Sequence, residues 1–362
     1  MNYKASFIEV FLVLNYYMKN ILLFIFISTS FLQDFDELYF GTDDALDIMT
    51  WNIEWFPKNG EITVNYVTQI IGALDIDVLA IQEVDNISSF NQLINSLENY
   101  EGYLESSWFA GLAYIYNSQT VEINDIYEIY TTSPYWSPFP RSPMVMDMNF
   151  MNENYIIINN HLKCCGDDYM NLNDEDDEET RRYIASNLLK EYIDNYFSDS
   201  NVFILGDLND QLIDSPNNNV FQMILDDFEN YLFTDMEIAQ GSNSDWSYPN
   251  WPSHLDHILI TNELFDMLDN IETIRIDYFM DGGFNEYDQN ISDHRPVALK
   301  ISTNVISLGD INLDGQINIV DVVLVIEIIL DSDNEYNLLA DLNEDGIVNI
   351  IDVVQLISEI LS

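Results

Sequence analysis

Positive charge is scarce in this chain of 362 residues, which holds 11 lysines and arginines against 63 aspartates and glutamates. The formal net charge is −52 at pH 7. A charge of this size keeps a protein soluble and opposes long-range attraction of a polyanion such as DNA. The composition therefore argues against a protein that binds nucleic acid through a basic surface, and it favours the binding of cations. A salty or calcium-rich medium is the alternative explanation for most of these carboxylates.

Cysteine and histidine are also rare. The only cysteines, Cys164 and Cys165, are neighbours, so no disulfide within the chain closes a long loop, and the redox compartment stays undetermined. A vicinal disulfide, two free thiols and a metal site all stay open for this pair. The four histidines fall in three short stretches, which are "NNHL" (His161), "SHLDHIL" (His254 and His257) and "SDHRPV" (His294).

Long apolar runs are absent after about residue 40, and the runs before it are too short to span a bilayer comfortably. From Met18, "MKNILLFIFISTSFLQ" has a basic start, a short apolar stretch and small polar residues, which is the layout of a secretory signal. We expect a signal-peptide region over residues 1–33, with Met18 as an alternative start. The mature protein is then secreted or attached to the cell surface, without an integral membrane span. A retained signal anchor is the alternative.

The length predicts one large domain with a smaller appendage. Between residues 45 and 302, β-like runs such as "IDVLAIQEV" and "NVFILGDLN" alternate with helical patterns such as "ETRRYIASNLLKEYIDNYF". Strands and helices interspersed in this way predict an α/β domain. No lysine or arginine follows Lys300, and this shift in composition marks a boundary before a second domain at residues 306–362.

The second domain contains an internal repeat. "DINLDGQINIVD" and "DLNEDGIVNIID" each precede an apolar helical run, and each has a glycine at its sixth position, where a sharp turn is needed. Ca²⁺ takes about six to eight oxygen ligands from alternate residues of such loops. Two loops in tandem therefore predict two calcium sites. The predicted ligands are Asp310, Asn312, Asp314, Gln316, Asn318 and Asp321 in the first loop, and Asp341, Asn343, Asp345, Ile347, Asn349 and Asp352 in the second, with Gln316 and Ile347 acting through their carbonyls.

A loop followed by one helix, twice, resembles a type I dockerin domain. The segment before Asp310 is too short and too β-branched to supply the first helix of a full EF-hand. This resemblance implies a small all-α domain, bound Ca²⁺ and a cohesin-like protein partner. Cellulosomal dockerins often carry a Ser-Thr pair at loop positions ten and eleven, whereas this chain has Ile-Val at 319–320 and Ile-Ile at 350–351. The identity of the partner is therefore open.

Polar residues end several predicted strands of the larger domain. Asp207 and Asn209 follow the apolar run "VFIL", and their two-residue spacing places both side chains on one face of a strand. Turn chemistry is the alternative, since Gly, Asp and Asn all favour turns. Asn52 and Glu83 also follow apolar runs. If these side chains meet at one rim, they suit a hard divalent ion and the hydrolysis of a phosphate ester.

Read in order along the chain, these motifs resemble the endonuclease/exonuclease/phosphatase superfamily, which includes DNase I-like nucleases, sphingomyelinases and inositol polyphosphate phosphatases. The resemblance spans about residues 47–302. It implies a four-layer α/β sandwich, in which two packed mixed β-sheets are flanked by helices. The motif residues are Asn52, Glu83, His161, Asp207, Asn209, Asp256, Asp293 and His294.

The resemblance also implies a metal site and a phosphate contact. Glu83 becomes the principal ligand of Mg²⁺ or Mn²⁺, and Asn52 and Asp293 assist it. Arg141 in "FPRSPM" resembles a phosphate-contacting arginine of DNase I-like members. The nearby Lys58 and other basic residues contact phosphate or simply pair with carboxylates.

The remaining motif residues take catalytic roles by the same resemblance. Asp207 orients or deprotonates the attacking water, and Asn209 and His161 stabilise the phosphorus centre and the leaving group. His294, steadied by Asp256, is the other acid or base. Which of Asp207 and His294 is the base stays open, and His161 is expected to be oriented by a backbone carbonyl.

The implied function is that of a secreted, metal-dependent phosphoric ester hydrolase, most simply a phosphodiesterase or nuclease. A sphingomyelinase-like enzyme, or a phosphohydrolase of inositol phosphates or other small molecules, is the alternative, because the motif residues act on the phosphate and not on what it carries. An alternative from another class is a non-catalytic binding platform attached through the dockerin-like tail.

Overall fold

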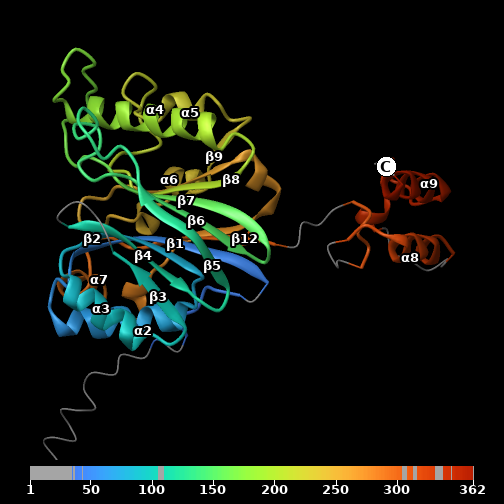
Figure 1. The fold of residues 1–362 in the computed structure, drawn as a ribbon, viewed down its shortest axis with the longest axis horizontal. Helices are drawn as coiled ribbons and strands as arrows, with labels where there is room; N and C mark the ends of the chain where they lie inside the picture. Colours follow the sequence, from blue (N-terminus) through green and yellow to red (C-terminus); the bar gives the residue numbers. More distant parts are fainter. Residues whose placement is uncertain are drawn as a thin grey trace, which may run out of the picture.

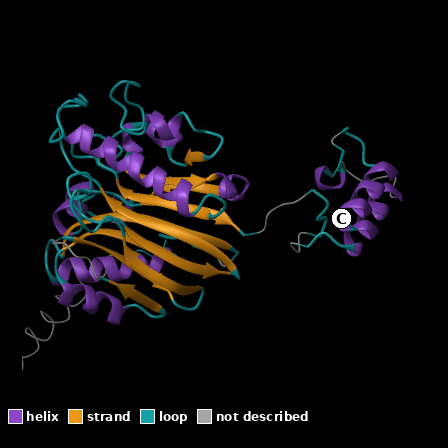
Figure 2. Ribbon diagram, turned by 45° about the horizontal axis from the view of Figure 1, so that its top comes forward, coloured by secondary structure: helices purple, strands orange, loops and turns teal. Residues whose placement is uncertain are grey.

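The computed structural model describes residues 35, 37–42, 44–104, 110–303, 308–312, 316–330, 337–343 and 345–361. The expected signal region, the predicted calcium ligand Asp314 and the loop glycine Gly315 lie outside these residues. In the described part, two β-sheets pack face to face between layers of helices, and a small helical unit follows (Figures 1 and 2).

Each sheet has six strands. The first sheet runs, in spatial order, β11 (Leu268–Thr273), β12 (Val297–Ser302), β1 (Ala45–Phe56), β2 (Val78–Val84), β4 (Gly111–Asn117) and β3 (Tyr100–Tyr103). The second runs β5 (Val121–Glu128), β6 (Met144–Phe150), β7 (Glu153–His161), β8 (Asn201–Asp207), β10 (Asp256–Thr261) and β9 (Tyr231–Phe233). Both are mixed sheets, because β1 pairs with β2, and β7 with β8, in parallel while the other pairs are antiparallel.

Helices cover the outer face of each sheet (Figure 1). Those on the first sheet are α2 (Glu61–Leu74), α3 (Ile87–Ser96) and α7 (Phe284–Asn290). Those on the second are α4 (Glu178–Tyr196), α5 (Gln222–Leu225) and α6 (Met236–Gln240). Short 3₁₀ turns lie at η1 (Asn243–Asp245), η2 (Asn262–Met267) and η3 (Ile276–Phe279). The predicted four-layer α/β sandwich is confirmed.

Strand β1 shows how the sequence builds these layers. Leu46 and Ile48 lie in the core between the sheets, whereas Met49 and Trp51 face the helices. Successive side chains of a strand point to opposite faces, so a strand buried on both faces is apolar almost throughout. The same alternation carries Asn52 onto the inner face, where it is buried just before the more exposed Glu54 and Trp55 near the end of the strand.

Alternation places three further polar residues on this inner face. Phe203 and Leu205 of β8 lie in the core between the sheets, so Asp207 follows them inward. In the strand register, Asp207 stands opposite His161 of parallel β7 and opposite Asp256 of antiparallel β10. Pairing of three neighbouring strands therefore puts these three side chains side by side.

The small C-terminal unit has its own core. Helices α8 (Ile319–Leu330) and α9 (Ile350–Ile360) and the turn η4 (Leu338–Ala340) enclose buried Val325 and Leu356. Among the described residues, no helix combines the length and apolar character that crossing a membrane requires.

Candidate active site

A cavity of about 730 Å³ opens at the rim where the polar strand ends meet. Its wall includes seven of the eight motif residues, and Asp256 lies just behind it, against His294. The cavity residues predicted from the sequence are Asn52, Glu83, His161, Asp207, Asn209, Asp293 and His294. Residues distant in sequence are thus brought to one place.

Asp207 is the centre of the arrangement. One of its oxygens accepts a hydrogen bond from Asn52 Nδ2 at 2.9 Å and lies 3.4 Å from His161 Nε2. The side chain is buried, and burial together with the nearby carboxylates of Asp256 and Glu83 raises its pKa to about 7, against the lowering effect of His294. A carboxylate with such a pKa can accept a proton near neutral pH.

Glu83 reaches the site through an irregularity in its strand. Regular alternation turns Gln82 inward, where it donates to Asn159, and would turn Glu83 away. Glu83 instead has φ of +65°, and the β1–β2 register shifts beside it. Its carboxylate then lies 3.4 Å from Asn52 Nδ2 and accepts a hydrogen bond from the backbone of Trp55 at 3.2 Å. Irregularities of this kind commonly redirect a side chain at active sites.

His294 and Asp256 form a buried pair. His294 Nδ1 lies 2.7 Å from Asp256 Oδ2, and its Nε2 faces Asp207 Oδ2 at 3.9 Å. Burial alone would lower the pKa of His294, but Asp256 and Asp207 outweigh it and raise the pKa to about 10. His294 is therefore an imidazolium at neutral pH, and the Tyr248 ring packs 4.7 Å from it.

His161 has the opposite electrostatic setting. Burial, together with the positive charges of Arg141 and His294, holds its pKa well below the usual value, so its imidazole is neutral. Its Nε2 faces Asp207 and Glu83, the latter at 3.8 Å. The expected backbone carbonyl is not found among the described residues, where the buried Nδ1 atom has no hydrogen-bond partner.

Asn209 and Asp293 are held by their backbones. Asn209 adopts a left-handed φ of +56°, its N–H donates to Asp207 Oδ1 at 3.1 Å, and its amide donates to the Leu162 carbonyl at 3.3 Å. The N–H of Asp293 donates to Glu54 Oε2 at 2.8 Å. Both side chains are thereby fixed at the cavity wall.

Glu54 is a site residue that the sequence reasoning missed. It lines the cavity, and Lys58 bridges it to Asp288. Burial and the neighbouring Asp293 carboxylate raise the pKa of Glu54 against the influence of Lys58. Its position two residues after Asn52 in "WNIEW" was the available signal.

The donor set fits a hard divalent cation. Carboxylates of Glu54, Glu83, Asp207 and Asp293 share one cavity wall, and like charges this close need a counter-cation or protons. Burial is the main cause of the raised pKa of Asp207, and the carboxylates of Asp256 and Glu83 add to it. Mg²⁺ is a hard cation that binds oxygen ligands, and proteins usually hold it with one or two carboxylates.

The basic residues near the motifs are mostly paired within the protein. Arg295 makes a two-pronged contact with Asp277, with nitrogen–oxygen distances of 2.9 and 2.8 Å, so its role is structural. Lys163 lies 3.8 Å from Glu178. Arg141 donates from Nε to the Ala110 carbonyl at 3.1 Å.

Two further features lie at the edge of the site. Cys164 and Cys165 both line the cavity as free thiols, and their sulfur atoms are 3.0 Å apart. Exposed aromatic residues, Trp55 and Trp251, also lie at the cavity wall. The mouth of the site is therefore aromatic while its floor is acidic.

The described parts of the two predicted calcium loops are closed around buried carboxylates. Asp341 accepts hydrogen bonds from the N–H groups of Asp345 and Gly346 at 3.2 and 2.8 Å, and Gly346 has φ of +82°, as the turn requires. Asp321 and Asp352, the twelfth residues, are fully buried and accept backbone N–H groups of their own loops.

Comparison with protein families gives two matches. Residues 49–294 match the model of the Endonuclease/Exonuclease/phosphatase family, and residues 308–361 match the Dockerin type I domain. No curated protein is matched by this chain.

Solved structures of similar fold are numerous. D. rerio TDP2 complexed with a single-strand DNA product is 14% identical, with a TM-score of 0.55, and covers 72% of this chain and 100% of that chain. The human Nocturnin catalytic domain with a bound sulfate anion is 16% identical, with a TM-score of 0.52 and coverage of 72% and 95%. An endonuclease/exonuclease/phosphatase from Bacteroides vulgatus is 14% identical, with a TM-score of 0.52 and coverage of 71% and 98%. At these identities the likeness concerns the fold.

Proposed function

Because the chain belongs to the endonuclease/exonuclease/phosphatase family, we propose that it is a secreted, metal-dependent hydrolase of phosphoric esters, most simply a phosphodiesterase. We assign catalysis to residues 45–302 and attachment to the dockerin-like residues 306–362. The observation that carries the proposal is the meeting of Asp207 with a neutral histidine, His161, and a charged one, His294, in one acidic cavity.

We assign the metal to Glu83, Asn52 and Asp293. When bound, Mg²⁺ or Mn²⁺ neutralises charge on the phosphoryl oxygens. The carboxylate and amide oxygens of these residues suit such an ion. Asn52 Nδ2 donates to Asp207, and Asn52 Oδ1 accepts the N–H of Glu54 at 3.0 Å, so a cation would bind the second lone pair of Oδ1.

The protein groups account for the movement of protons. Water attacks phosphorus and gives its proton to Asp207, whose pKa near 7 suits a general base. The bond from phosphorus to the leaving oxygen breaks, and the imidazolium of His294 stabilises or protonates that oxygen. The amide of Asn209 and the neutral ring of His161 donate hydrogen bonds to the negative charge that develops.

The charge around the cavity favours a short phosphodiester over long duplex DNA. Binding of a polyanion draws on several free lysines and arginines, whereas Lys58, Lys163 and Arg295 are paired with carboxylates. The rings of Trp55 and Trp251 at the mouth suit stacking with a base or an apolar group beside the phosphate. Arg141 is the proposed contact for a phosphoryl oxygen.

A substrate panel tests the proposal. The purified protein is assayed with Mg²⁺, Mn²⁺ and Ca²⁺ on duplex DNA, single-stranded DNA, RNA, sphingomyelin, inositol phosphates and an aryl phosphodiester. We expect hydrolysis of one class, abolished by EDTA and by Asp207→Asn. The matched control is Asp125→Asn, which changes an exposed carboxylate on β5. Absence of hydrolysis of every ester would support the alternative of a non-catalytic binding platform.

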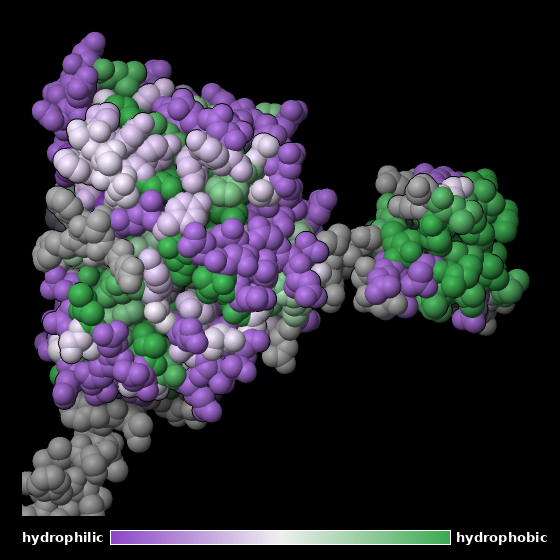
Figure 3. Space-filling view, in the orientation of Figure 1, coloured by the Kyte–Doolittle hydropathy of each residue, from purple (hydrophilic) through white to green (hydrophobic). Residues whose placement is uncertain are grey.

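The dockerin-like unit is the proposed attachment site, with Ca²⁺ in its loops and a cohesin-like protein as its partner. Its surface in Figure 3 is predominantly apolar. Residues at loop positions ten and eleven are exposed in both repeats: Ile319 (65%), Val320 (49%), Ile350 (65%) and Ile351 (55%). An exposed apolar patch of this kind marks an interaction site. We therefore expect the partner to present an apolar surface and not hydroxyl acceptors.

A pull-down with a panel of purified cohesins tests this attachment. Binding should need Ca²⁺ and should be lost when Ile319, Val320, Ile350 and Ile351 are all replaced by Ser. Glu327→Gln, on an exposed position of α8, is the control. Binding that survives the four replacements would place the partner surface elsewhere.

A further inference from the structure

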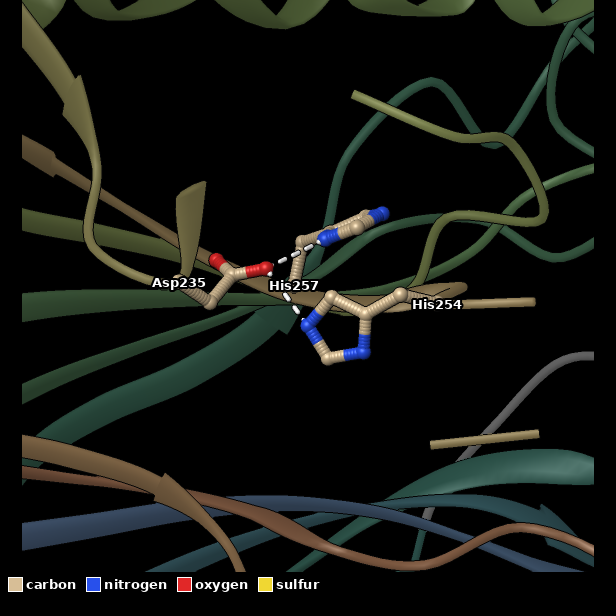
Figure 4. A group of neighbouring side chains, drawn as sticks. All are labelled: Asp235, His254 and His257. Carbon is tan, nitrogen blue, oxygen red and sulfur yellow. Dashed lines mark hydrogen bonds and ion pairs between the residues drawn. The ribbon is translucent and has the colours of Figure 1, made fainter. Parts of the chain in front are cut away.

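A second group of ionisable side chains is buried behind the active site, on the outer face of the second sheet. Asp235 Oδ2 lies 2.6 Å from His257 Nδ1 and 3.0 Å from His254 Nε2, as Figure 4 shows. All three residues are at least 99% buried. None of them lines the catalytic cavity, so the group needs another explanation.

The hydrogen bonds of the two rings identify which nitrogens carry protons. His257 Nε2 lies 2.9 Å from the carbonyl oxygen of Asp210, and its Nδ1 faces the carboxylate. Both nitrogens of His257 face acceptors, so both carry protons and the ring is an imidazolium. His254 Nδ1 accepts the N–H of Ser247 at 3.2 Å, so its proton is on Nε2, which lies 3.0 Å from Asp235 Oδ2 without hydrogen-bond geometry.

This pattern excludes a metal at the group, although its three side chains are of metal-binding type. His254 Nδ1 accepts the N–H of Ser247, so the nitrogen of His254 that faces Asp235 carries the ring proton and has no lone pair for a cation. The 2.6 Å separation of His257 Nδ1 from the Asp235 oxygen is also shorter than the roughly 3.3 Å between ligand atoms of a tetrahedral zinc site. Asp235 and His257 therefore form an ion pair, and the neutral ring of His254 lies beside it.

Through His257, this group contacts the loop that carries the proposed catalytic base. His257 donates to the carbonyl of Asp210, the residue that follows Asn209. The same loop begins at Asp207, and its left-handed residue Asn209 donates its N–H to that carboxylate. The imidazolium therefore fixes the loop from the side opposite the substrate.

Through His254, the group contacts the residues that hold the charged histidine, His294. His254 accepts the N–H of Ser247, whose hydroxyl oxygen accepts the N–H of Asp256 at 3.2 Å. The carbonyl of Ser247 accepts the N–H of Arg295 at 2.7 Å, next to His294. Ser247 thus holds the backbone of Asp256 and that of the residue after His294.

We propose that Asp235 is a positioning residue of the active site, which sets the placement of Asp207 and Asn209 through His257 and of Asp256 and His294 through His254. The proposal rests on the function proposed above. The two histidines lie three residues apart, one before β10 and one within it, and Asp256 lies between them. The single carboxylate of Asp235 therefore contacts side chains that lead to both halves of the site.

The first test concerns protonation and does not depend on catalysis. Nitrogen–proton correlation spectra of the histidine rings in the full-length protein should show two ring N–H groups on His257 and one, at Nε2, on His254. In Asp235→Asn, the backbone amide signals of Asn209 and Arg295 should shift together. A neutral His257 in the native protein, or unchanged amide signals in the variant, would overturn the proposal even if no substrate were hydrolysed.

The second test uses the phosphodiester that the panel identifies, with Mg²⁺. We expect Asp235→Asn to lower kcat at least about tenfold with KM changed less than about twofold, since the substrate-facing groups are retained but misplaced. Leu259→Val, on the same face of β10 as His257, is the matched control. It should lower the thermal midpoint while leaving kcat within about twofold.

His254→Gln keeps the Asp235–His257 ion pair and covers the case in which Asp235→Asn does not fold. It should lower kcat because it disturbs the contacts from His254 that position Asp256 and His294. Equal kcat losses in Asp235→Asn and Leu259→Val would show that the group serves stability alone. Wild-type kcat in both His254→Gln and Asp235→Asn would show the same.

Discussion

The Nδ1 atom of His294 lies 2.7 Å from an oxygen of Asp256, and this contact aims the other ring nitrogen at Asp207. The two residues are 38 positions apart in sequence. Strand β10 supplies the carboxylate and the loop before β12 supplies the ring. The contact fixes both the orientation and the charge of the imidazolium.

Replacement of the Asp256 carboxylate should impair the reaction although the His294 ring is retained. In Asp256→Asn we expect kcat to fall roughly 10²- to 10⁴-fold, in line with the loss of an aspartate that orients a catalytic histidine. Because Asp256 raises the pKa of His294, the alkaline limb of the kcat–pH profile should move to lower pH. A kcat–pH profile identical to that of the wild type would show that Asp256 does not set the pKa of His294. Asp269→Asn, an exposed change on β11, serves as the control.

The Asp235–His257 pair makes stability depend on pH. Burial disfavours both charges, but each partner outweighs it, so the pKa of Asp235 is lowered from 3.8 and that of His257 is raised from 6.5. The aspartate contribution is present above pH 3.8 and is lost as pH falls through the lowered pKa. The histidine contribution is present below pH 6.5 and is lost as pH rises through the raised pKa.

His257→Gln should therefore cost most between these two values. We expect a loss of about 3 kcal/mol in the free energy of unfolding near pH 5.5, since one charge of a buried pair is left unpaired, and a smaller loss at alkaline pH. Urea titrations of both proteins across this range measure the difference. A loss that is constant with pH would show that His257 is uncharged in the folded state.

Metal binding should be visible as stabilisation. A cation that binds only the folded protein raises the thermal midpoint as its concentration increases, and we expect this with Mg²⁺ or Mn²⁺. Glu83→Gln should remove most of the shift, whereas Glu122→Gln, exposed on β5, should retain it. The calcium loops need a separate control, so the measurement uses a background of Asp321→Asn with Asp352→Asn. An unchanged shift in Glu83→Gln would move the metal to other ligands.

The calcium loops should be coupled to folding of the C-terminal unit. In the full-length protein, Ca²⁺ should increase the protection of α8 and α9 amides from hydrogen exchange. Asp321→Asn combined with Asp352→Asn should abolish this change, because both carboxylates are the buried twelfth residues of their loops. Exchange in β7 and β8 is the internal reference. Equal protection with and without Ca²⁺ would contradict two calcium-dependent loops.

The sequence was most informative where polar residues interrupt apolar strands. "VFILGDLND" predicted a buried strand that ends at Asp207, because an apolar run followed by Gly, Asp and Asn marks a strand terminus. It was less informative for Glu83, whose inward position depends on a backbone irregularity and not on alternation. The repeat at residues 306–362 was readable because ligand spacing along a tight loop is local.

Long-range pairing was harder to predict. Arg295 lies in a catalytic motif, yet its guanidinium pairs with Asp277, and only the path of the chain through η3 brings them together. Asp235 sits in "FTDMEI" with no neighbouring histidine, so its contacts with His254 and His257 depend on strand β9 pairing with β10. Such residues carry no signal until the sheet order is known.

The most direct test of the central claim is the steady-state hydrolysis of bis(4-nitrophenyl) phosphate by the wild-type protein and Asp207→Asn, in Mg²⁺ and in Mn²⁺. The account predicts metal-dependent turnover by the wild type and a kcat at least about a hundredfold lower in the variant, in which the proton acceptor is lost. Equal turnover by the two proteins would contradict the assignment of Asp207 as the centre of the site.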